Sequence, residues 1–184
     1  LPGPGEEVKT DRFVATVGGG AVITAVQASR LGMPTDLVTA IGSSSAARLK
    51  REKVRIHNLL RSGEPHAVSA ALSTTDERSF VTFNGVNDQL EARLPAAIAG
   101  QRARHVHFAL APRSCPRWVR IVEGLRAHGV TTSWDFGWNP SLRAASGFSA
   151  LAGACDIVFV NEAEASMYAR ARTIAAAIMA KPER

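Results

Sequence analysis

The segment VGGGAVITAVQASRLG, residues 17–32, determines how the rest of the chain can be interpreted. Gly18, Gly19 and Gly20 end a β-branched segment, and small and apolar residues with helical spacing follow them as far as Gly32. Glycine adopts positive φ and lets another group approach the main chain closely. The first turn of a helix also presents unpaired N–H groups and a partial positive charge. The segment is therefore either a loop that binds a polar or anionic ligand or a tight packed connection, and the glycines alone do not separate the two.

The glycine pattern differs from two common nucleotide-binding motifs. Ala21, Val22 and Ile23 follow Gly20, so the G-x-G-x-x-G dinucleotide fingerprint is absent. No Gly-Lys-Ser/Thr follows the glycines, so the segment is not a Walker loop either. These differences disfavour a nucleotide-binding oxidoreductase.

Composition indicates a globular chain with a sizeable core. The chain has 184 residues, of which 46% are hydrophobic and 21% are charged. Its net charge of +6 comes from scattered arginines without a run of basic residues, so we expect no nucleic-acid partner. No apolar run reaches the roughly 18 residues that span a bilayer, and no signal peptide is visible, so we expect a cytoplasmic protein with no membrane partner. Cys115 and Cys155 lie far apart and predict reduced, half-buried thiols.

Strand-like and helical segments alternate along the chain. Alternating or apolar runs predict strands at residues 8–17, 36–41, 54–60, 105–110, 130–136 and 156–160. Helical spacing predicts helices at residues 21–31, 46–53, 94–99, 117–128, 149–152 and 161–169. Residues 66–73 and 78–84 predict a hairpin around Thr74-Thr75-Asp76-Glu77. This alternation is typical of a parallel α/β sheet, with the hairpin and the first strand as a small β appendage.

Polar side chains follow two predicted strands of the C-terminal half, where ligands of a parallel sheet collect. Asp135 lies at the end of the strand at 130–136 and can be a turn residue or a ligand to substrate. Asn161-Glu162-Ala163-Glu164 follows the strand at 156–160. Asn161 can cap the next helix, and the acidic residues then favour its dipole. Alternatively, a carboxylate can hold Mg²⁺ near a nucleotide phosphate.

The five histidines show no metal-binding spacing on a shared element. His105 and His107 would lie on one face of a predicted strand, but no further ligand group accompanies them. We therefore expect them to be packing residues.

Taken in order, these segments resemble the PfkB-type, or ribokinase-like, carbohydrate kinase family. The motifs that carry the resemblance are Gly18-Gly19-Gly20-Ala21 with Leu31-Gly32, the hairpin with Asp76-Glu77-Arg78-Ser79-Phe80, the region from Asp135 through Asn139 and Pro140 to Arg143, and the segment from Asp156 to Ala165. The resemblance covers nearly the whole chain. It implies a ribokinase-like three-layer α/β/α core with a small β-sheet lid, in a single partial domain over residues 1–184. The lid strands would lie at about residues 6–17 and 66–84.

The resemblance implies ATP-dependent phosphorylation of a sugar or related small alcohol, with ATP and Mg²⁺ as cofactors. The substrate-binding positions that it implies are Gly18, Gly19, Gly20 and Asp135. The cofactor-binding positions are Asn161 and Glu164, of which Glu164 is also the metal-binding position. Because the lid is often a dimer surface in relatives, the resemblance also implies a homodimer through the lid.

The sequence departs from the family pattern at positions that matter for chemistry. Ile23 stands where the family has an Asn that binds substrate hydroxyls, and isoleucine can neither donate nor accept a hydrogen bond. Gly42-Ser43-Ser44-Ser45 replaces an expected Gly-Asp-Asp stretch. No Gly-x-Gly-Asp segment, which carries the catalytic Asp of the family, occurs in the 184 residues, so we assign no catalytic residue and expect the chain alone to be inactive. The alternative is a catalytically inactive, kinase-derived module that binds a sugar or dimerises.

Overall fold

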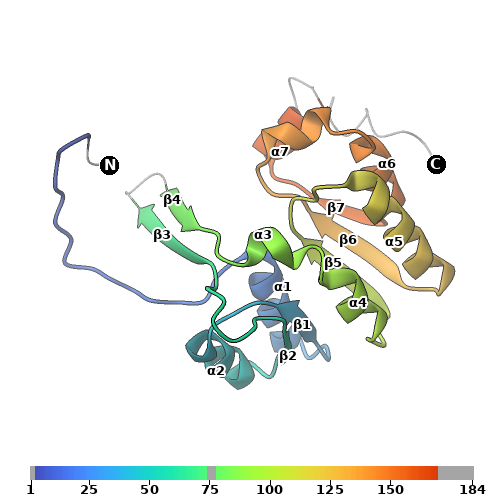
Figure 1. Cartoon of the computed structure of the whole chain (residues 1–184), viewed down its shortest axis with the longest axis horizontal. Coiled ribbons are helices and arrows are strands. Elements are labelled where there is room, and N and C mark those ends of the chain that lie inside the picture. Colours follow the sequence, from blue (N-terminus) through green and yellow to red (C-terminus); the bar gives the residue numbers. More distant parts are fainter. Residues whose placement is uncertain (1–2, 74–77, 170–184) are drawn as a thin grey trace. The chain divides into compact units, whose positions relative to one another are not determined.

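The computed structural model describes residues 3–73 and 78–169 of the chain (Figure 1). Helices alternate with strands in this part of the chain, and the strands of two of its sheets run parallel, which agrees with the α/β class predicted from the sequence. The chain divides into two compact units, Leu1–Ile98 and Ala99–Arg184, and each unit is described separately below. Within the described ranges, no helix combines the length and the apolar character needed to cross a bilayer.

The first unit contains a small parallel sheet flanked by helices. Helix α1 (Gly20–Arg30) precedes strand β1 (Asp36–Thr39), and helix α2 (Ser43–Arg51) precedes strand β2 (Arg55–Asn58). Strands β1 and β2 pair in parallel, with Asp36 opposite Arg55. The buried side chains of this layer are Val22, Ala25, Leu37, Leu49 and Val54. They come from both helices, from β1 and from the residue that precedes β2, so the core lies between the helices and the sheet.

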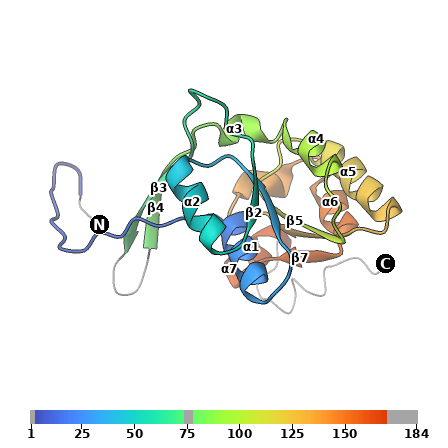
Figure 2. The same cartoon turned by 90° about the horizontal axis from the view of Figure 1, so that it is seen from below.

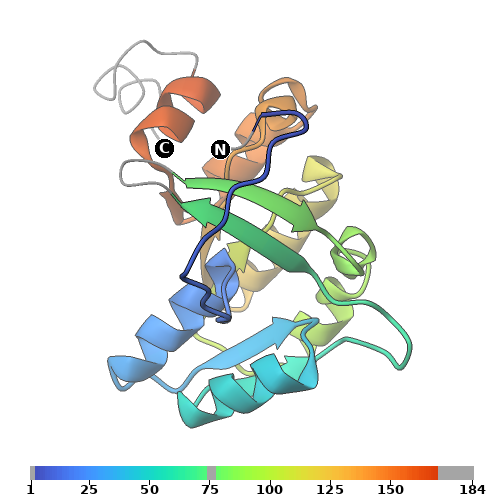
Figure 3. The ribbon, with the colours of Figure 1, turned by 90° about the vertical axis from the view of Figure 1, so that its left-hand side faces the viewer.

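The predicted hairpin is present in the first unit. Strands β3 (Val68–Ser73) and β4 (Arg78–Phe83) pair antiparallel, as Figure 3 shows in green. The predicted turn at 74–77 lies outside the described residues. Helices α3 (Asn87–Leu90) and α4 (Leu94–Ala99) follow the hairpin, and only the second of them was expected from the sequence.

The predicted first lid strand is not formed. The structure has no strand at residues 6–17, and the side chains of residues 6–16 are exposed. A β-strand is stabilised by the ladder of hydrogen bonds to its neighbour, and no described strand pairs with this segment. The backbone N–H of Arg12 instead donates to Thr10 Oγ1 at 3.2 Å, a local bond that competes with extended pairing. The alternating pattern of this segment therefore did not predict its conformation correctly.

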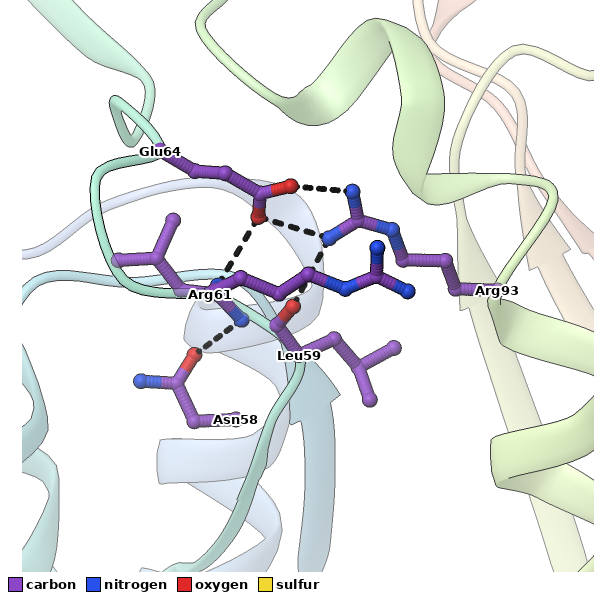
Figure 4. Close-up of polar contacts among 6 residues, drawn as sticks. Asn58, Leu59, Arg61, Glu64 and Arg93 are labelled. Atoms are coloured by element: carbon purple, nitrogen blue, oxygen red, sulfur yellow. Dashed lines mark hydrogen bonds and ion pairs between the residues drawn. The ribbon is translucent and has the colours of Figure 1, made fainter.

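Both connections of the hairpin are anchored at its base (Figure 4). The carboxylate of Glu64 accepts hydrogen bonds from both terminal nitrogens of Arg93, one of them at 2.8 Å, and from the backbone N–H of Arg61 at 2.9 Å. Arg93 Nη1 also donates to the carbonyl of Leu59 at 3.0 Å. These bonds join the connection from β2 to β3 with the segment that follows α3. The Arg93 side chain, and after it the Arg61 N–H, lower the pKa of Glu64 to about 2.

The segments that enter and leave the hairpin also approach each other closely next to the Glu64–Arg93 ion pair. The backbone N–H of Val86 donates to the carbonyl of Pro65 at 2.9 Å. Gly85 has φ of +53°, and a Cβ built there would lie 2.5 Å from the Pro65 carbonyl oxygen. Only glycine is compatible with this close approach and with this backbone conformation.

The second unit is a three-stranded parallel sheet with helices on one face. Its elements in chain order are β5 (His105–Ala109), α5 (Cys115–Ala127), β6 (Thr131–Asp135), the 3₁₀-helix η1 (Pro140–Ala144), α6 (Phe148–Ala154), β7 (Ile157–Phe159) and α7 (Glu162–Ala169). The sheet order is β5-β6-β7, and helices α5 and α6 lie side by side (Figures 1 and 2). These bounds agree with the predicted elements to within a few residues, whereas η1 was not expected.

Aromatic side chains make up much of the core of the second unit. Trp118 of α5 and Trp134 of β6 are both fully buried, with ring centroids 5.2 Å apart. Trp134 also stacks on Phe108 of β5, with centroids 4.5 Å apart. Cys115 and Cys155 are not joined to each other by a disulfide, and they are buried at 2% and 0% exposure rather than half-buried as expected.

The opposite face of this sheet carries polar side chains. Ser133 Oγ lies 2.8 Å from His105 Nε2 and 2.8 Å from His107 Nδ1. His105 Nδ1 also lies 2.8 Å from Thr131 Oγ1. The two histidines are thus held by hydroxyl groups of the neighbouring strand. His105 is exposed, so the prediction of a packing residue is wrong for it, whereas His107 is partly buried.

Candidate functional site

The glycine segment forms the N-terminus of α1 in the first unit. Gly19 is the N-cap residue, and its φ of +98° is a conformation that residues with a side chain rarely adopt. The helix begins with a hydrogen bond from the N–H of Ile23 to the carbonyl of Gly19 at 3.0 Å. No side chain caps this helix, and all three glycines are exposed. The loop is therefore exposed and uncapped, and its role in binding a polar ligand stays a prediction. Ile23, 57% exposed at the end of the first turn of α1, offers such a ligand no polar group.

Asp135 lies at the carboxyl end of β6, as predicted. Its Oδ1 accepts a hydrogen bond from the backbone N–H of Gly137 at 2.9 Å, and Gly137 has φ of +64°. The side chain is half-buried. The turn interpretation of Asp135 therefore holds, and it leaves a carboxylate at the edge where ligands of parallel sheets collect.

Asn161 and Glu164 form a reciprocal capping box at the start of α7. Asn161 Oδ1 accepts from the N–H of Glu164 at 2.9 Å, and Glu164 Oε2 accepts from the N–H of Asn161 at 3.0 Å. Each side chain thus satisfies a backbone donor that the first turn of a helix leaves unpaired. Asn161 is exposed, whereas Glu164 is buried at 9% exposure. The capping interpretation is confirmed, and the role of this pair in binding Mg²⁺ or phosphate stays a prediction.

Tyr168 is a residue of this region that the sequence did not single out. Its hydroxyl donates to the carbonyl of Gly137 at 2.6 Å and accepts from the N–H of Asn139 at 3.3 Å. Burial is the main cause of the raised pKa of Tyr168, and the charges of Glu164 and Asp135 also raise it. An aromatic residue on the helix four positions after Glu164 was the available signal, but the partners lie about thirty positions earlier in the chain.

The structure brings part of the predicted site together. Register places Asp135 opposite Phe159, so Asp135 and the capping box follow the carboxyl ends of neighbouring parallel strands. The glycine loop belongs to the first unit, and its position relative to the second unit stays a prediction. Among residues 3–73 and 78–169, no group of three His, Cys, Asp or Glu side chains could hold a metal ion.

The chain belongs to the PfkB family. The family model for pfkB family carbohydrate kinases matches residues 2–183, which is nearly the whole chain. The expectation drawn from the glycine segment, the hairpin and the Asn161–Glu164 motif is thus confirmed at the level of the family.

Individual relatives are kinases with the same fold. A nucleoside kinase of Methanothermobacter thermautotrophicus is 27% identical over 172 residues, which are 89% of this chain and 55% of that protein. Phosphofructokinase-2 of Escherichia coli, solved in its tetrameric inhibited form, has a TM-score of 0.69 at 14% identity, with 98% of this chain and 62% of that chain covered. A protein provisionally named ribokinase II from E. coli, solved with ATP and Mg²⁺, has a TM-score of 0.64 at 19% identity, with 94% and 62% covered. The chain therefore has the ribokinase-like fold, and it spans little more than half the length of these relatives.

Proposed function

We propose that the protein containing this chain transfers the terminal phosphoryl group of ATP to a hydroxyl of a sugar or of a related small alcohol such as a nucleoside. The observation that carries the proposal is the family match over residues 2–183. The nucleoside kinase of M. thermautotrophicus supports the inclusion of nucleosides, whose ribose carries similar hydroxyl groups.

The residues at the strand ends of the second unit suit two different parts of such a reaction. In the proposal, the carboxylate of Asp135 accepts a hydrogen bond from a substrate hydroxyl, and the backbone of Gly18, Gly19 and Gly20 lines the substrate. Asn161 and Glu164 lie on the side of the phosphates. The Asp135 Oδ1 bond to Gly137 fixes the direction of the carboxylate before substrate arrives, which lowers the ordering cost of binding.

In the proposal, most ligands of Mg²⁺ are water molecules and substrate phosphates rather than protein side chains. Mg²⁺ in phosphoryl-transfer sites keeps several waters and takes one or two carboxylates together with substrate phosphates. Glu164 supplies one carboxylate, and its Oε2 is already shared with the cap of α7. When bound, Mg²⁺ would neutralise charge on the transferred phosphoryl group. The ribokinase II structure with ATP and Mg²⁺ supports this choice of cofactors.

A phosphorylation assay tests the proposal directly. The complete reading frame and the 184-residue chain would each be incubated with ATP, Mg²⁺ and a panel of sugars and nucleosides, and ADP release would be measured. We expect turnover by the complete protein and none by the 184 residues alone, because they contain no Gly-x-Gly-Asp segment. Asp135→Asn keeps an oxygen for the Gly137 bond but removes the charge, so the acceptor KM should rise about tenfold or more. If the complete protein releases no ADP with any acceptor, the proposed function is wrong.

A second candidate is a kinase-derived module that binds a sugar or dimerises without phosphoryl transfer. The observation that favours it is the exposed apolar side chain of Ile23, at the position where the resemblance implies a hydroxyl-binding Asn. Calorimetric binding by the complete protein to a sugar, in the absence of any ADP release, would support this candidate over the kinase.

A further inference from the structure

Tyr168 occupies the middle of a continuous series of hydrogen bonds. Asp135 Oδ1 accepts from the N–H of Gly137, and the carbonyl of Gly137 accepts from the Tyr168 hydroxyl. The same hydroxyl accepts from the N–H of Asn139, whose Oδ1 in turn accepts from the N–H of Ser141 at 3.2 Å. The series runs from the candidate substrate ligand to the start of η1. Without the phenol oxygen it would be interrupted at its centre.

The ring of Tyr168 is held in place by aromatic neighbours from two other elements. Its centroid lies 4.9 Å from that of Phe148, at the start of α6, and 6.3 Å from that of Phe136, which follows β6. Such packing restricts the rotamers of the ring and so directs its hydroxyl at the loop. A phenol is protonated at neutral pH and can donate to Gly137, and burial raises the pKa of Tyr168 further above its ordinary value.

The helix that carries Tyr168 also carries the capping box. Tyr168 lies four positions after Glu164 on α7, a spacing that places two residues on one face of a helix. The phosphate-side residues of the proposed function and the anchor of the Asp135 loop are therefore parts of one rigid element. A displacement of the loop from α7 would change the spacing between the two halves of this candidate site.

We propose that Tyr168 is a positioning residue, whose hydroxyl holds the loop between Asp135 and Asn139 against α7 and so sets Asp135 relative to the Asn161–Glu164 cap. The ordering of this loop by Tyr168 depends only on the hydrogen bonds within the second unit. The consequence for substrate binding rests on the proposed function.

Amide hydrogen exchange of the ligand-free chain tests the first part. Tyr168→Phe keeps the ring and its packing but removes both hydrogen bonds to the loop. The loss of one or two net hydrogen bonds should speed exchange of the Asn139 amide about two- to tenfold, with amides in β6 unchanged. Ser166→Ala removes a hydroxyl from the same helix and is the matched control. Exchange of Asn139 that is equal in wild type and Tyr168→Phe would overturn the proposal.

Kinetics of the complete protein test the second part. Tyr168→Phe should raise the KM for the acceptor about two- to tenfold while kcat stays within about twofold, because the binding geometry of Asp135 loosens and the reacting groups are kept. A purely structural role would lower the amount of folded enzyme and leave KM unchanged, and that result would overturn the proposal. If the wild-type protein shows no turnover, the proposed function fails, and hydrogen exchange still decides the role of Tyr168.

Discussion

Ile23 is the residue at which the resemblance to the family implies a departure in chemistry, since an Asn is expected there. The backbone of the glycine loop is kept, with Gly19 at positive φ and an uncapped helix start, but the side chain one turn later is apolar. An isoleucine that is 57% exposed packs little of its surface against the core, so neither helix α1 nor its core contacts depend on it. Neither the stability of the fold nor hydrogen bonding to a hydroxylated ligand explains why position 23 is an isoleucine.

Restoring a polar side chain at this position is the corresponding test. Ile23→Asn should strengthen binding of a hydroxylated sugar or nucleoside by about fivefold, as one net hydrogen bond allows, at a cost of a few tenths of a kcal/mol in helix propensity. Isothermal titration calorimetry on the complete protein measures the affinity, and Ile23→Leu is the matched control. Equal affinity of the Asn and Leu variants would show that this position does not face the ligand.

At the scale of elements, the Glu64–Arg93 pair sets the base of the β3–β4 hairpin. Its atoms come from two connections, one before β3 and one after α3, so neither element could hold the geometry alone. Both side chains are largely shielded, at 21% and 16% exposure, which distinguishes the pair from the fully exposed pair of Lys9 and Glu7. Arg93 also donates a hydrogen bond to the Leu59 carbonyl, so the ion pair also holds the backbone of the connection between β2 and β3.

The pH dependence of stability reports on this ion pair. Because the folded pKa of Glu64 is lowered from 4.5 to about 2, its contribution is present above about pH 4.5 and is lost as the pH falls towards 2. Glu64→Gln should therefore flatten the fall in the free energy of unfolding between these values, as measured by urea denaturation at a series of pH values. Glu7→Gln serves as the control and should leave the profile unchanged. Parallel profiles for wild type and Glu64→Gln would contradict the assigned role.

At the scale of the whole molecule, the hairpin exposes an apolar face. The register of β3 and β4 places four exposed hydrophobic side chains on one face: Val68, Leu72, Val81 and Phe83. A small hairpin with such a face is a candidate surface for association, because burying it removes apolar area from water. The resemblance to PfkB-type kinases, in which the lid often forms a dimer surface, makes self-association through this face the natural proposal.

Disrupting that face tests the homodimer. Val81→Ser combined with Phe83→Ser should convert the protein to a monomer in size-exclusion chromatography with light scattering. Phe80 is 63% exposed but lies on the opposite face of the hairpin, so Phe80→Ser should leave the mass unchanged. A double variant with the mass of the wild-type protein would exclude this face as the interface.

The sequence was most informative where a structure depends on neighbours a few positions away. The capping box of Asn161 and Glu164, the positive φ at Gly19 and the two strands of the hairpin were all predictable from local spacing. The family itself was also readable, because the order of its motifs along the chain is a one-dimensional property. For the segment at 8–17, local alternation was insufficient, since a strand requires a partner that alternation does not supply.

The sequence by itself determined the family, the parallel α/β class and the local geometry at the start of α1 and α7. Only the tertiary structure decided that the Tyr168 hydroxyl meets Gly137 and Asn139, and that Arg93 meets Glu64, twenty-nine positions earlier in the chain. The physical reason is the reach of the interactions. Caps and turns are satisfied within a few residues and leave a signature in sequence spacing, whereas bonds between distant segments form only after strands and helices have packed.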